Sequence, residues 1–252
     1  MTNSTSHNRN HIWHRVTAYT SNLGLWRGLG LVAHRWLGKL FNPAVDFVWG
    51  GLGEDALIWY YLTEVLSFRQ KGFYVDVGCN DPIHHSNTYR LYQLGWRGIA
   101  IDADQDLVEK YAKIRPRDTV VAALVSDLER GMDFHVFEGT EVSTVDLPSA
   151  KIWGESKEVL EIRKLESRTL NKILDECKCP TEFELLKIDV EGHDAAVLRS
   201  VDLGKYRPRI ILIEIHNQTV ESVVSTEIYQ ILSRLEYKMV SLAGYNGFFV
   251  RK

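Results

Sequence analysis

The densest group of chemically reactive side chains lies in residues 187–194, directly after an apolar run. This segment contains Asp189, Glu191 and His193, and His216 follows the next apolar run of the chain. A histidine titrates near neutral pH and can take a proton from a reacting hydroxyl; His216 is the first candidate for this role and His193 the second. Asp189 and Glu191 can orient that base or hold a divalent cation. Because no His/Asp cluster has compelling metal-ligand spacing, the sequence predicts no metal site.

A second reactive segment, with the pattern Asp-x-Gly-x-Asn, begins at Asp76 near the end of a β-branched run. Here the backbone must bend and let a ligand approach, which Gly78 permits because it has no Cβ. The Asp76 carboxylate can hold an ammonium or shape the loop. The pattern is not the Gly-x-Gly-x-x-Gly that cradles a pyrophosphate, so it favours a phosphate-free cofactor such as S-adenosyl-L-methionine (SAM). Asn80 and Ser86, in the same loop, are assigned to this cofactor site.

Acidic and polar residues also end the next two runs. Asp102 follows Asp76 by 26 positions. A carboxylate roughly 20 residues after the first motif, at the end of the next strand, is placed to accept both ribose hydroxyls of an adenosine. The alternative is that Asp102 only caps the helix that follows. Ser126 and Asp127, after the third run, are expected where the edge of the adenine would lie.

These residues need a sheet that brings strand ends together. The short apolar runs are residues 73–77, 99–102, 119–125, 185–190 and 210–215. Between them lie helix-like stretches at residues 56–69, 87–94, 105–114, 168–176, 195–201 and 226–235. This alternation predicts an α/β fold with a mostly parallel seven-stranded sheet and helices on both faces. Residues 237–242 and 248–251, joined by a Gly/Asn turn, predict a terminal antiparallel hairpin, as in class I methyltransferases rather than dehydrogenases.

Several segments together resemble the FkbM family of SAM-dependent methyltransferases. They are Gly-Glu-Asp at 53–55, FYVDVGCNDPIHHSNTYRLYQLGWRGIAIDAD at 73–104, Arg-Pro-Arg-Asp at 115–118 and LLKIDVEG at 185–192. The resemblance covers residues 50–216. It implies a class I SAM-dependent methyltransferase (Rossmann-like) fold, SAM as cofactor and, most often, O-methylation of a sugar or polyketide hydroxyl. The chain departs from the family pattern at Asp102, where Glu is usual, at Cys79, where Ala is frequent, and at His193-Asp194, which follow Glu-Gly.

The chain divides by charge and pattern. Residues 1–45 hold five basic residues and no Asp or Glu, a charge of +5. Since the whole chain has a formal net charge of −3, residues 46–252 carry −8. We expect a basic, Trp-containing extension at 1–45 and one methyltransferase domain at 46–252. Within that domain, residues 131–165 are read as an insertion that covers the substrate site. Residues 12–41 can lie on an anionic membrane surface, or pack on the acidic domain as a lid.

The expected function is O-methylation of a hydroxyl on a saccharide or saccharide-containing metabolite. The partner is then a small-molecule or glycan acceptor and not a nucleic acid, because Asp-Val-Glu-Gly stands where amino-group methyltransferases carry Asp/Asn-Pro-Pro-Tyr/Phe. The start of the chain lacks the features of a secretory signal, so a cytoplasmic location is expected. The membrane association expected with it is peripheral and runs through residues 12–41. The alternatives are a nicotinamide-dependent oxidoreductase and a non-catalytic SAM-fold binding module.

Overall fold

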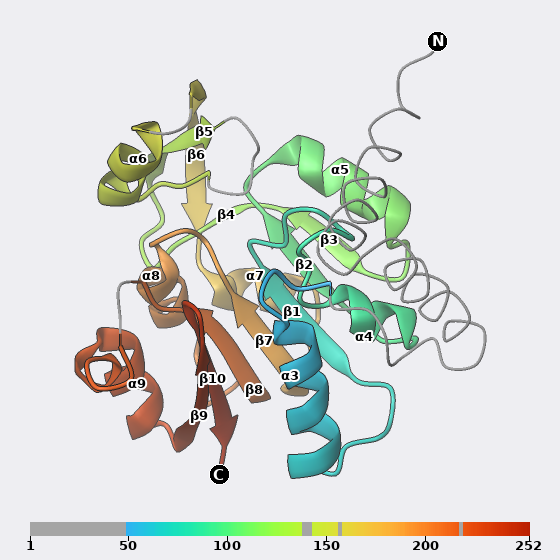
Figure 1. Cartoon of the computed structure of the whole chain (residues 1–252). Coiled ribbons are helices and arrows are strands. Elements are labelled where there is room, and N and C mark those ends of the chain that lie inside the picture. The colour runs from blue at the N-terminus through green and yellow to red at the C-terminus, as the bar shows by residue number, and fades with distance from the viewer. Residues whose placement is uncertain (1–48, 138–142, 156–157, 217–218) are drawn as a thin grey trace, which may run out of the picture. The chain divides into compact units, whose positions relative to one another are not determined.

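The main sheet has seven strands, in a computed structural model that describes residues 49–137, 143–155, 158–216 and 219–252. The strands are β1 (Phe73–Val77), β2 (Arg97–Asp102), β3 (Thr119–Ala122), β7 (Glu182–Ile188), β8 (Arg207–Glu214), β9 (Tyr237–Ala243) and β10 (Asn246–Arg251). They lie in the order β3-β2-β1-β7-β8-β10-β9 (Figure 1). Neighbours are parallel except at β10, which is antiparallel to β8 and β9. The predicted fold class, including the terminal hairpin, is confirmed.

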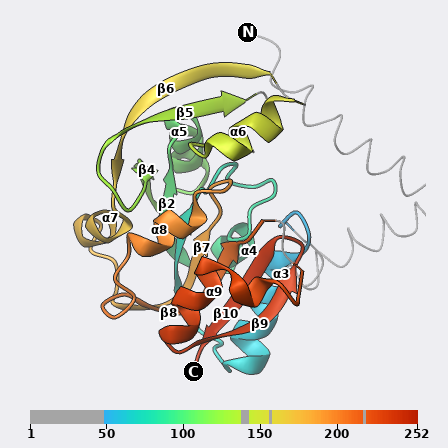
Figure 2. The ribbon, with the colours of Figure 1, turned by 90° about the vertical axis from the view of Figure 1, so that its left-hand side faces the viewer.

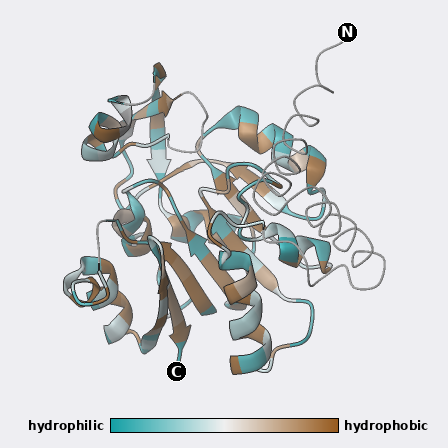
Figure 3. Cartoon of the chain, viewed as in Figure 1, coloured by the Kyte–Doolittle hydropathy of each residue, from teal (hydrophilic) through white to brown (hydrophobic). Residues whose placement is uncertain are grey.

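Helices cover both faces of this sheet. On one face, α3 (Glu54–Tyr60), α4 (Tyr89–Gln93) and α5 (Gln105–Ile114) pack against alternate strand residues such as Tyr74 and Ala100. On the other face, α7 (Leu170–Glu176), α8 (Asp194–Arg199) and α9 (Glu227–Arg234) pack against residues such as Val75 and Ile211. Figure 2 shows this second layer on the near side, and Figure 3 shows the apolar strands between the layers. Strands covered on both faces read as continuous apolar runs, which is why the sequence indicated them.

The first described helix differs from the prediction. One helix was expected over residues 56–69, but α3 begins at Glu54 and continues as a π-helix over Tyr61–Val65. In this region the Thr63 hydroxyl donates to the Trp59 carbonyl, and the Leu66 N–H donates to the Tyr61 carbonyl five residues back. Wide turns of this kind form when the regular ladder of i to i−4 hydrogen bonds is interrupted.

A smaller three-stranded sheet, ordered β4-β6-β5, lies beside the main one. It consists of β4 (Leu124–Val125), β5 (Gly131–Phe137) and β6 (Val159–Arg168), and α6 (Leu147–Gly154) lies between the last two. The strand predicted at 119–125 is therefore two strands in two sheets. The break falls at Ala123, whose N–H donates to the Asp102 carbonyl while β4 pairs with β6. The sequence did not indicate β6, because most of its residues are exposed and it has no continuous apolar run.

The predicted basic extension, with its membrane-contacting residues 12–41, lies outside the described residues and stays a prediction. A short 3-10 helix at Val223–Ser225 completes the elements of the part of the chain that is described. None of the helices in that part is long and apolar enough to span a bilayer.

Candidate functional site

A cleft of about 310 Å³ lies at the carboxyl ends of β1, β2 and β7. This is the edge at which open α/β sheets bind ligands. Of the residues singled out from the sequence, those that line the cleft are Asp76, Gly78, Asn80, Ser86, Asp102, Asp189, Glu191 and His193. Ser126, Asp127 and His216 are not among the lining residues. The structure thus brings together most of the residues predicted from two separate motifs.

Lys187 joins these two motifs. The register of β1 and β7 places it beside Asp76, and its Nζ lies 3.4 Å from Asp76 Oδ1 and 3.5 Å from Asp189 Oδ2. The same Nζ donates to the Gly78 carbonyl oxygen at 2.7 Å. Burial opposes the charge, but Asp189 and Asp76 outweigh it and raise the pKa of Lys187, which stays an ammonium. Sequence reasoning gave Lys187 no role, although a lysine inside an apolar strand is a signal of a buried ion pair.

Gly78 is required by the chain itself. It has φ of +74°, and a Cβ built on it would lie 1.8 Å from the carbonyl oxygen of Asp189. The Asp189 N–H in turn donates to the Val77 carbonyl. We expected the glycine to admit a ligand; the structure shows that it admits the backbone of the loop after β7. Gly78 still lines the cleft, because the two loops meet at its edge.

Asp102 is held in place by backbone donors. Its Oδ2 accepts the N–H of Asn80 at 2.9 Å, and its Oδ1 accepts the N–H of Asp104 at 2.9 Å. Burial raises the pKa of Asp102, although these two donors and the charge of Lys187 act in the opposite direction. Each carboxylate oxygen can accept one more hydrogen bond. Asp102 lines the cleft, and the N-cap of the next helix, α5, is Asp104, so a role of Asp102 in cofactor binding stays a prediction that its position allows.

Arg115 holds the loop after β1 in place through hydrogen bonds. Its side chain is fully buried, and its guanidinium donates to the Pro82 carbonyl, to Thr88 Oγ1 and to Ser86 Oγ. The Thr88 hydroxyl in turn donates to Asp76 Oδ2 at 2.7 Å, so Arg115 and Asp76 are linked through Thr88. Ser86 was predicted to bind the cofactor; it lines the cleft, but its hydroxyl is engaged by Arg115. Sequence reasoning missed the role of Arg115, since a buried arginine looks like a surface one in a sequence.

Ser126 and Asp127 do not line the cleft, and their assignment to the adenine edge stays a prediction. The Asp127 carboxylate pairs with Arg199 of α8 at 2.7 Å. Burial raises the pKa of Asp127, but the hydrogen bond and the charge of Arg199 outweigh it and lower that pKa. Ser126 Oγ lies 2.9 Å from His193 Nε2. Burial lowers the pKa of His193, which favours the neutral ring. After Ala123 the chain leaves the main sheet, so residues 126–127 follow β4 of the smaller sheet.

The predicted insertion contributes one wall of the cleft. Phe134 of β5 and the residues Ser143, Thr144 and Val145 line it. The Thr144 hydroxyl donates to the Glu191 carbonyl oxygen at 2.7 Å, which ties this wall to the loop after β7. The smaller sheet is therefore attached directly to the segment that carries the reactive carboxylates.

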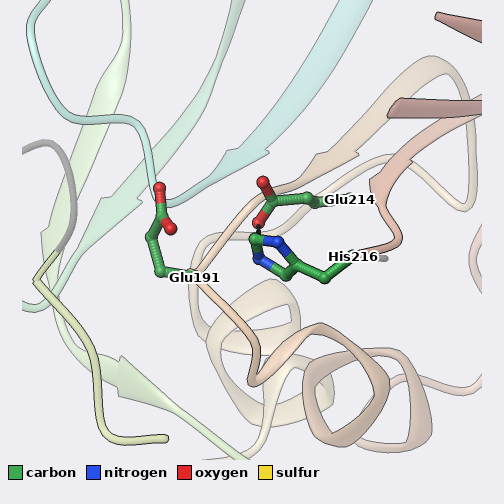
Figure 4. A group of neighbouring side chains, drawn as sticks. All are labelled: Glu191, Glu214 and His216. Carbon is green, nitrogen blue, oxygen red and sulfur yellow. Dashed lines mark ion pairs between the residues drawn. The ribbon is translucent and has the colours of Figure 1, made fainter. Parts of the chain in front are cut away.

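Beyond the cleft, the ends of β7 and β8 bring three side chains together (Figure 4). One ligand atom each from Glu191, Glu214 and His216 lies within 4.8 Å of the others. Glu214 Oε2 and His216 Nε2 are 2.9 Å apart. Glu191 also lines the cleft, so it connects this group to the cleft. We expected Asp189 and His216 to face one cleft; Asp189 does, whereas His216 is reached through Glu191.

The carboxyl groups in this region favour protonation. The pKa of Glu191 is raised to about 8, first by burial and then by the charges of Glu214 and Asp189. Burial and Asp189 likewise raise the pKa of Glu214. The pKa of Asp194 is raised to about 8, first by burial and then by the charge of Glu214, although its carboxylate accepts two backbone N–H hydrogen bonds. Perturbed acids concentrated beside a cleft are a feature of functional sites.

Comparison with known proteins gives one match that covers most of the chain. Residues 76–239 match the family described as the methyltransferase FkbM domain. No match was found among curated proteins. Solved structures that resemble the fold include a TehB-like SAM-dependent methyltransferase from Corynebacterium glutamicum, with 11% identity over 88% of this chain and 97% of that chain at a TM-score of 0.39.

Two further structures are similar to the same degree. A 1,6-didemethyltoxoflavin-N1-methyltransferase from Burkholderia thailandensis shows 10% identity over 99% of this chain and 90% of that chain, at a TM-score of 0.39. A methyltransferase from Geobacter sulfurreducens shows 14% identity over 95% of this chain and 96% of that chain, at a TM-score of 0.38. All three TM-scores are below 0.5.

Proposed function

Because the chain belongs to the FkbM family of SAM-dependent methyltransferases, we propose that it methylates a hydroxyl oxygen of a saccharide or a saccharide-containing metabolite. The observation that carries the proposal is the group formed by Glu191, Glu214 and His216, which adjoins the cleft through Glu191. A hydroxyl acceptor must lose its proton to react, and this group offers a base beside the cleft. Reactive groups of this kind are most useful where an uncharged oxygen is the nucleophile.

The residues of the cleft fit SAM. Asp102 offers two free acceptor positions to a pair of ribose hydroxyls. Asp76 Oδ1 is buried and accepts no hydrogen bond within the described residues, and an ammonium group of a ligand would supply one. The cleft, at about 310 Å³, also falls in the range of small-molecule sites, roughly 300–1,000 Å³. These features support binding of SAM with its adenosine over β2 and its amino acid part near β1.

Catalysis then depends on alignment and on removal of one proton. When bound, SAM would supply a methyl group on a sulfonium. An oxygen nucleophile in line with the carbon–sulfur bond would take the methyl group, and the sulfur would leave as a neutral thioether. The chain has to hold the two reactants in line, which is the larger part of such catalysis. For the proton, His216 is paired with Glu214 at 2.9 Å, and His193 lines the cleft beside Ser126. We assign the proton to His216 first and to His193 second.

The saccharide acceptor is supported by the polar side chains that line the cleft, among them Asn80, Ser143, Asp189 and Glu191. Sugar hydroxyls donate to carboxylates and exchange hydrogen bonds with such side chains. The loop after β7 reads Asp-Val-Glu-Gly and has no Pro-Pro, the element that amino-group methyltransferases use to hold a base or an amide.

The test is to find where the methyl group goes. Purified full-length chain is incubated with methyl-labelled SAM and a metabolite and glycan extract of cells that lack the gene, and labelled products are analysed by tandem mass spectrometry and linkage analysis. We expect a methyl ether on a sugar oxygen, one CH₂ heavier than the precursor. Label on a nitrogen, on carbon or on nucleic acid would overturn the proposal. Replacing His216 by Ala should abolish transfer while leaving SAM affinity unchanged in calorimetry.

A further inference from the structure

Three polar atoms in the group beyond the cleft lack hydrogen-bond partners. Glu191 Oε2, Glu214 Oε2 and His216 Nε2 are buried, and none makes a hydrogen bond within the described residues. Glu214 is only 8% exposed. The 2.9 Å contact between Glu214 and His216 does not have the geometry of a hydrogen bond. Orphaned buried polar atoms are rare in proteins, and three that adjoin one another indicate a missing partner.

The charges of this group are also unbalanced. Within the described residues, neither Glu191 nor Glu214 forms an ion pair with a lysine or arginine. The nearby ammonium of Lys187 is engaged by Gly78, Asp76 and Asp189. Two buried carboxylates at this separation repel each other unless a positive charge lies between them. A protonated His216, 2.9 Å from Glu214, can carry that charge, and a cation bound by all three side chains can carry it in place of the proton.

The backbone holds the three side chains in position. Glu214 ends β8, and His216 lies two residues further on in a turn, with its Nε2 2.9 Å from Glu214 Oε2. Glu191 has φ of +55°, a left-handed conformation that is costly for a residue with a Cβ. Its turn is fixed by Asp194, which accepts the N–H of Val190 and of Gly192. Strain of this kind persists where the side chain has a function.

We propose that Glu191, Glu214 and His216 form a binding site for a divalent cation. The proposal rests on the proposed function, because the cation would bind the acceptor hydroxyl beside the cleft. Two carboxylates and one imidazole make a mixed oxygen and nitrogen donor set, which suits Mn²⁺ and similar divalent ions. Three protein ligands leave coordination positions open for water and for the acceptor, as in catalytic metal sites. Nε2 of His216 is then a ligand, which replaces the assignment of His216 as the base: the methyl transfer to a hydroxyl stays as proposed, and the cation takes over the activation of that hydroxyl.

A cation here changes how the acceptor is activated. A hydroxyl bound to a divalent ion has a lowered pKa, as water does at such sites. The O–H proton leaves to water in the open cleft. The oxygen forms a bond to the methyl carbon, the carbon–sulfur bond breaks, and its electron pair stays on sulfur. No oxidant or reductant is needed, so atoms and electrons balance with SAM and the hydroxyl alone.

The test measures binding of Mn²⁺ alone to the full chain, first stripped with a chelator, by calorimetry and by the loss of the free-ion signal in electron paramagnetic resonance. We expect one site. Glu214→Gln and His216→Ala should each weaken it by at least about tenfold, since even supporting contacts at metal sites contribute that much. Glu176→Gln, an exposed carboxylate outside the cleft, is the matched control and should bind Mn²⁺ as the unchanged chain does.

Folding and SAM binding are checked separately in every variant, by circular dichroism and by calorimetry with SAM. A folded chain that binds SAM but neither Mn²⁺, Mg²⁺ nor Zn²⁺ would overturn the proposal. So would variants at Glu214 and His216 that bind Mn²⁺ with unchanged affinity. If the chelator-treated chain still methylates a sugar hydroxyl at the full rate, the cation proposal is wrong and the proposed function stands. If the chain binds Mn²⁺ but methylates a nitrogen, the proposed function is wrong and the cation site stands.

Discussion

At the scale of single residues, two positions restrict which side chain fits. Asp102 accepts two backbone N–H groups beside the cleft, and Gly78 must lack a Cβ. Both were identified from the sequence, but their surroundings were not. Asp102 is buried enough for its pKa to rise, and Gly78 touches a loop more than one hundred residues away in the chain. Each leads to a prediction.

SAM affinity should depend on pH through Asp102. The pKa of Asp102 is raised by burial, with Asp104 adding to the effect and Lys187 opposing it. A protonated carboxyl is a poorer acceptor for ribose hydroxyls, so affinity is full above this raised pKa and falls as pH drops through it. The fall should begin at higher pH than for an ordinary aspartate. Calorimetry across the acidic range measures it, and Asp102→Asn should bind more weakly with a flatter profile; an unchanged profile would contradict the assignment.

Gly78→Ala should destabilise the fold by about 2 kcal/mol or more, because φ is +74° and the new Cβ would meet the Asp189 carbonyl oxygen. The free energy of unfolding in urea measures this. Gly154→Ala is the matched control, since a Cβ there meets nothing within 4 Å. Equal stability of the two variants would show that the loops can separate without cost.

At the scale of elements, two loops are fixed by side chains from other elements. Arg115, at the end of α5, holds the loop between β1 and α4 through Pro82, Ser86 and Thr88. Thr144, in the segment before α6, holds the loop after β7 through the Glu191 carbonyl. The cleft therefore has its shape because of contacts made from outside its main strands.

Arg115→Met should cost about 3–5 kcal/mol, since it removes the buried cation that pairs with Asp118 and donates to Pro82, Thr88 and Ser86. It should also weaken SAM binding, because the loop lines the cleft. Thermal unfolding and calorimetry are the measurements. Arg117→Met, at an exposed arginine two residues away, provides the comparison. A stable Arg115 variant with full SAM affinity would contradict this role.

Thr144→Val should affect the acceptor more than SAM. It keeps the shape of a side chain that is only 1% exposed but removes the hydrogen bond to the Glu191 carbonyl. We expect transfer to fall several-fold, with SAM affinity within about twofold, since a neutral hydrogen bond contributes about 1 kcal/mol. Steady-state kinetics and SAM calorimetry separate the two effects. Thr119→Val, at an exposed position on β3, is the control; a selective loss of SAM affinity at Thr144 would be the opposite result.

At the scale of the whole molecule, the fold could be predicted and the site only in part. β1, β7 and β8 are buried on both faces, so their apolar runs were visible, and the family resemblance is confirmed by the match over residues 76–239. β6 is largely exposed, and no sequence period distinguishes it. The contact of Glu191 with Glu214 and His216 joins separate segments, so it was not predicted as a metal-ligating set.

The two sheets should differ in local stability. Strand β7 is buried along most of its length, whereas β6 is exposed over most of its residues and pairs, within the described residues, with the strands β4 and β5 only. Elements with few buried contacts open at lower free energy. Amide hydrogen exchange should therefore be faster in β5 and β6 than in β7 and β8. Equal protection in the two sheets would show that they unfold as one unit.

The break at Ala123 divides the cleft between two bodies of different origin in the fold. Asp76, Asp102 and Lys187 belong to the main sheet, whereas Phe134 and Thr144 belong to the smaller sheet or the segment beside it. The smaller sheet has a separate apolar cluster around Leu124, Phe134 and Val136. Because the two walls come from separate sheets, we expect substitutions in the smaller sheet to change binding of the proposed acceptor while the proposed SAM contacts of the main sheet stay in place.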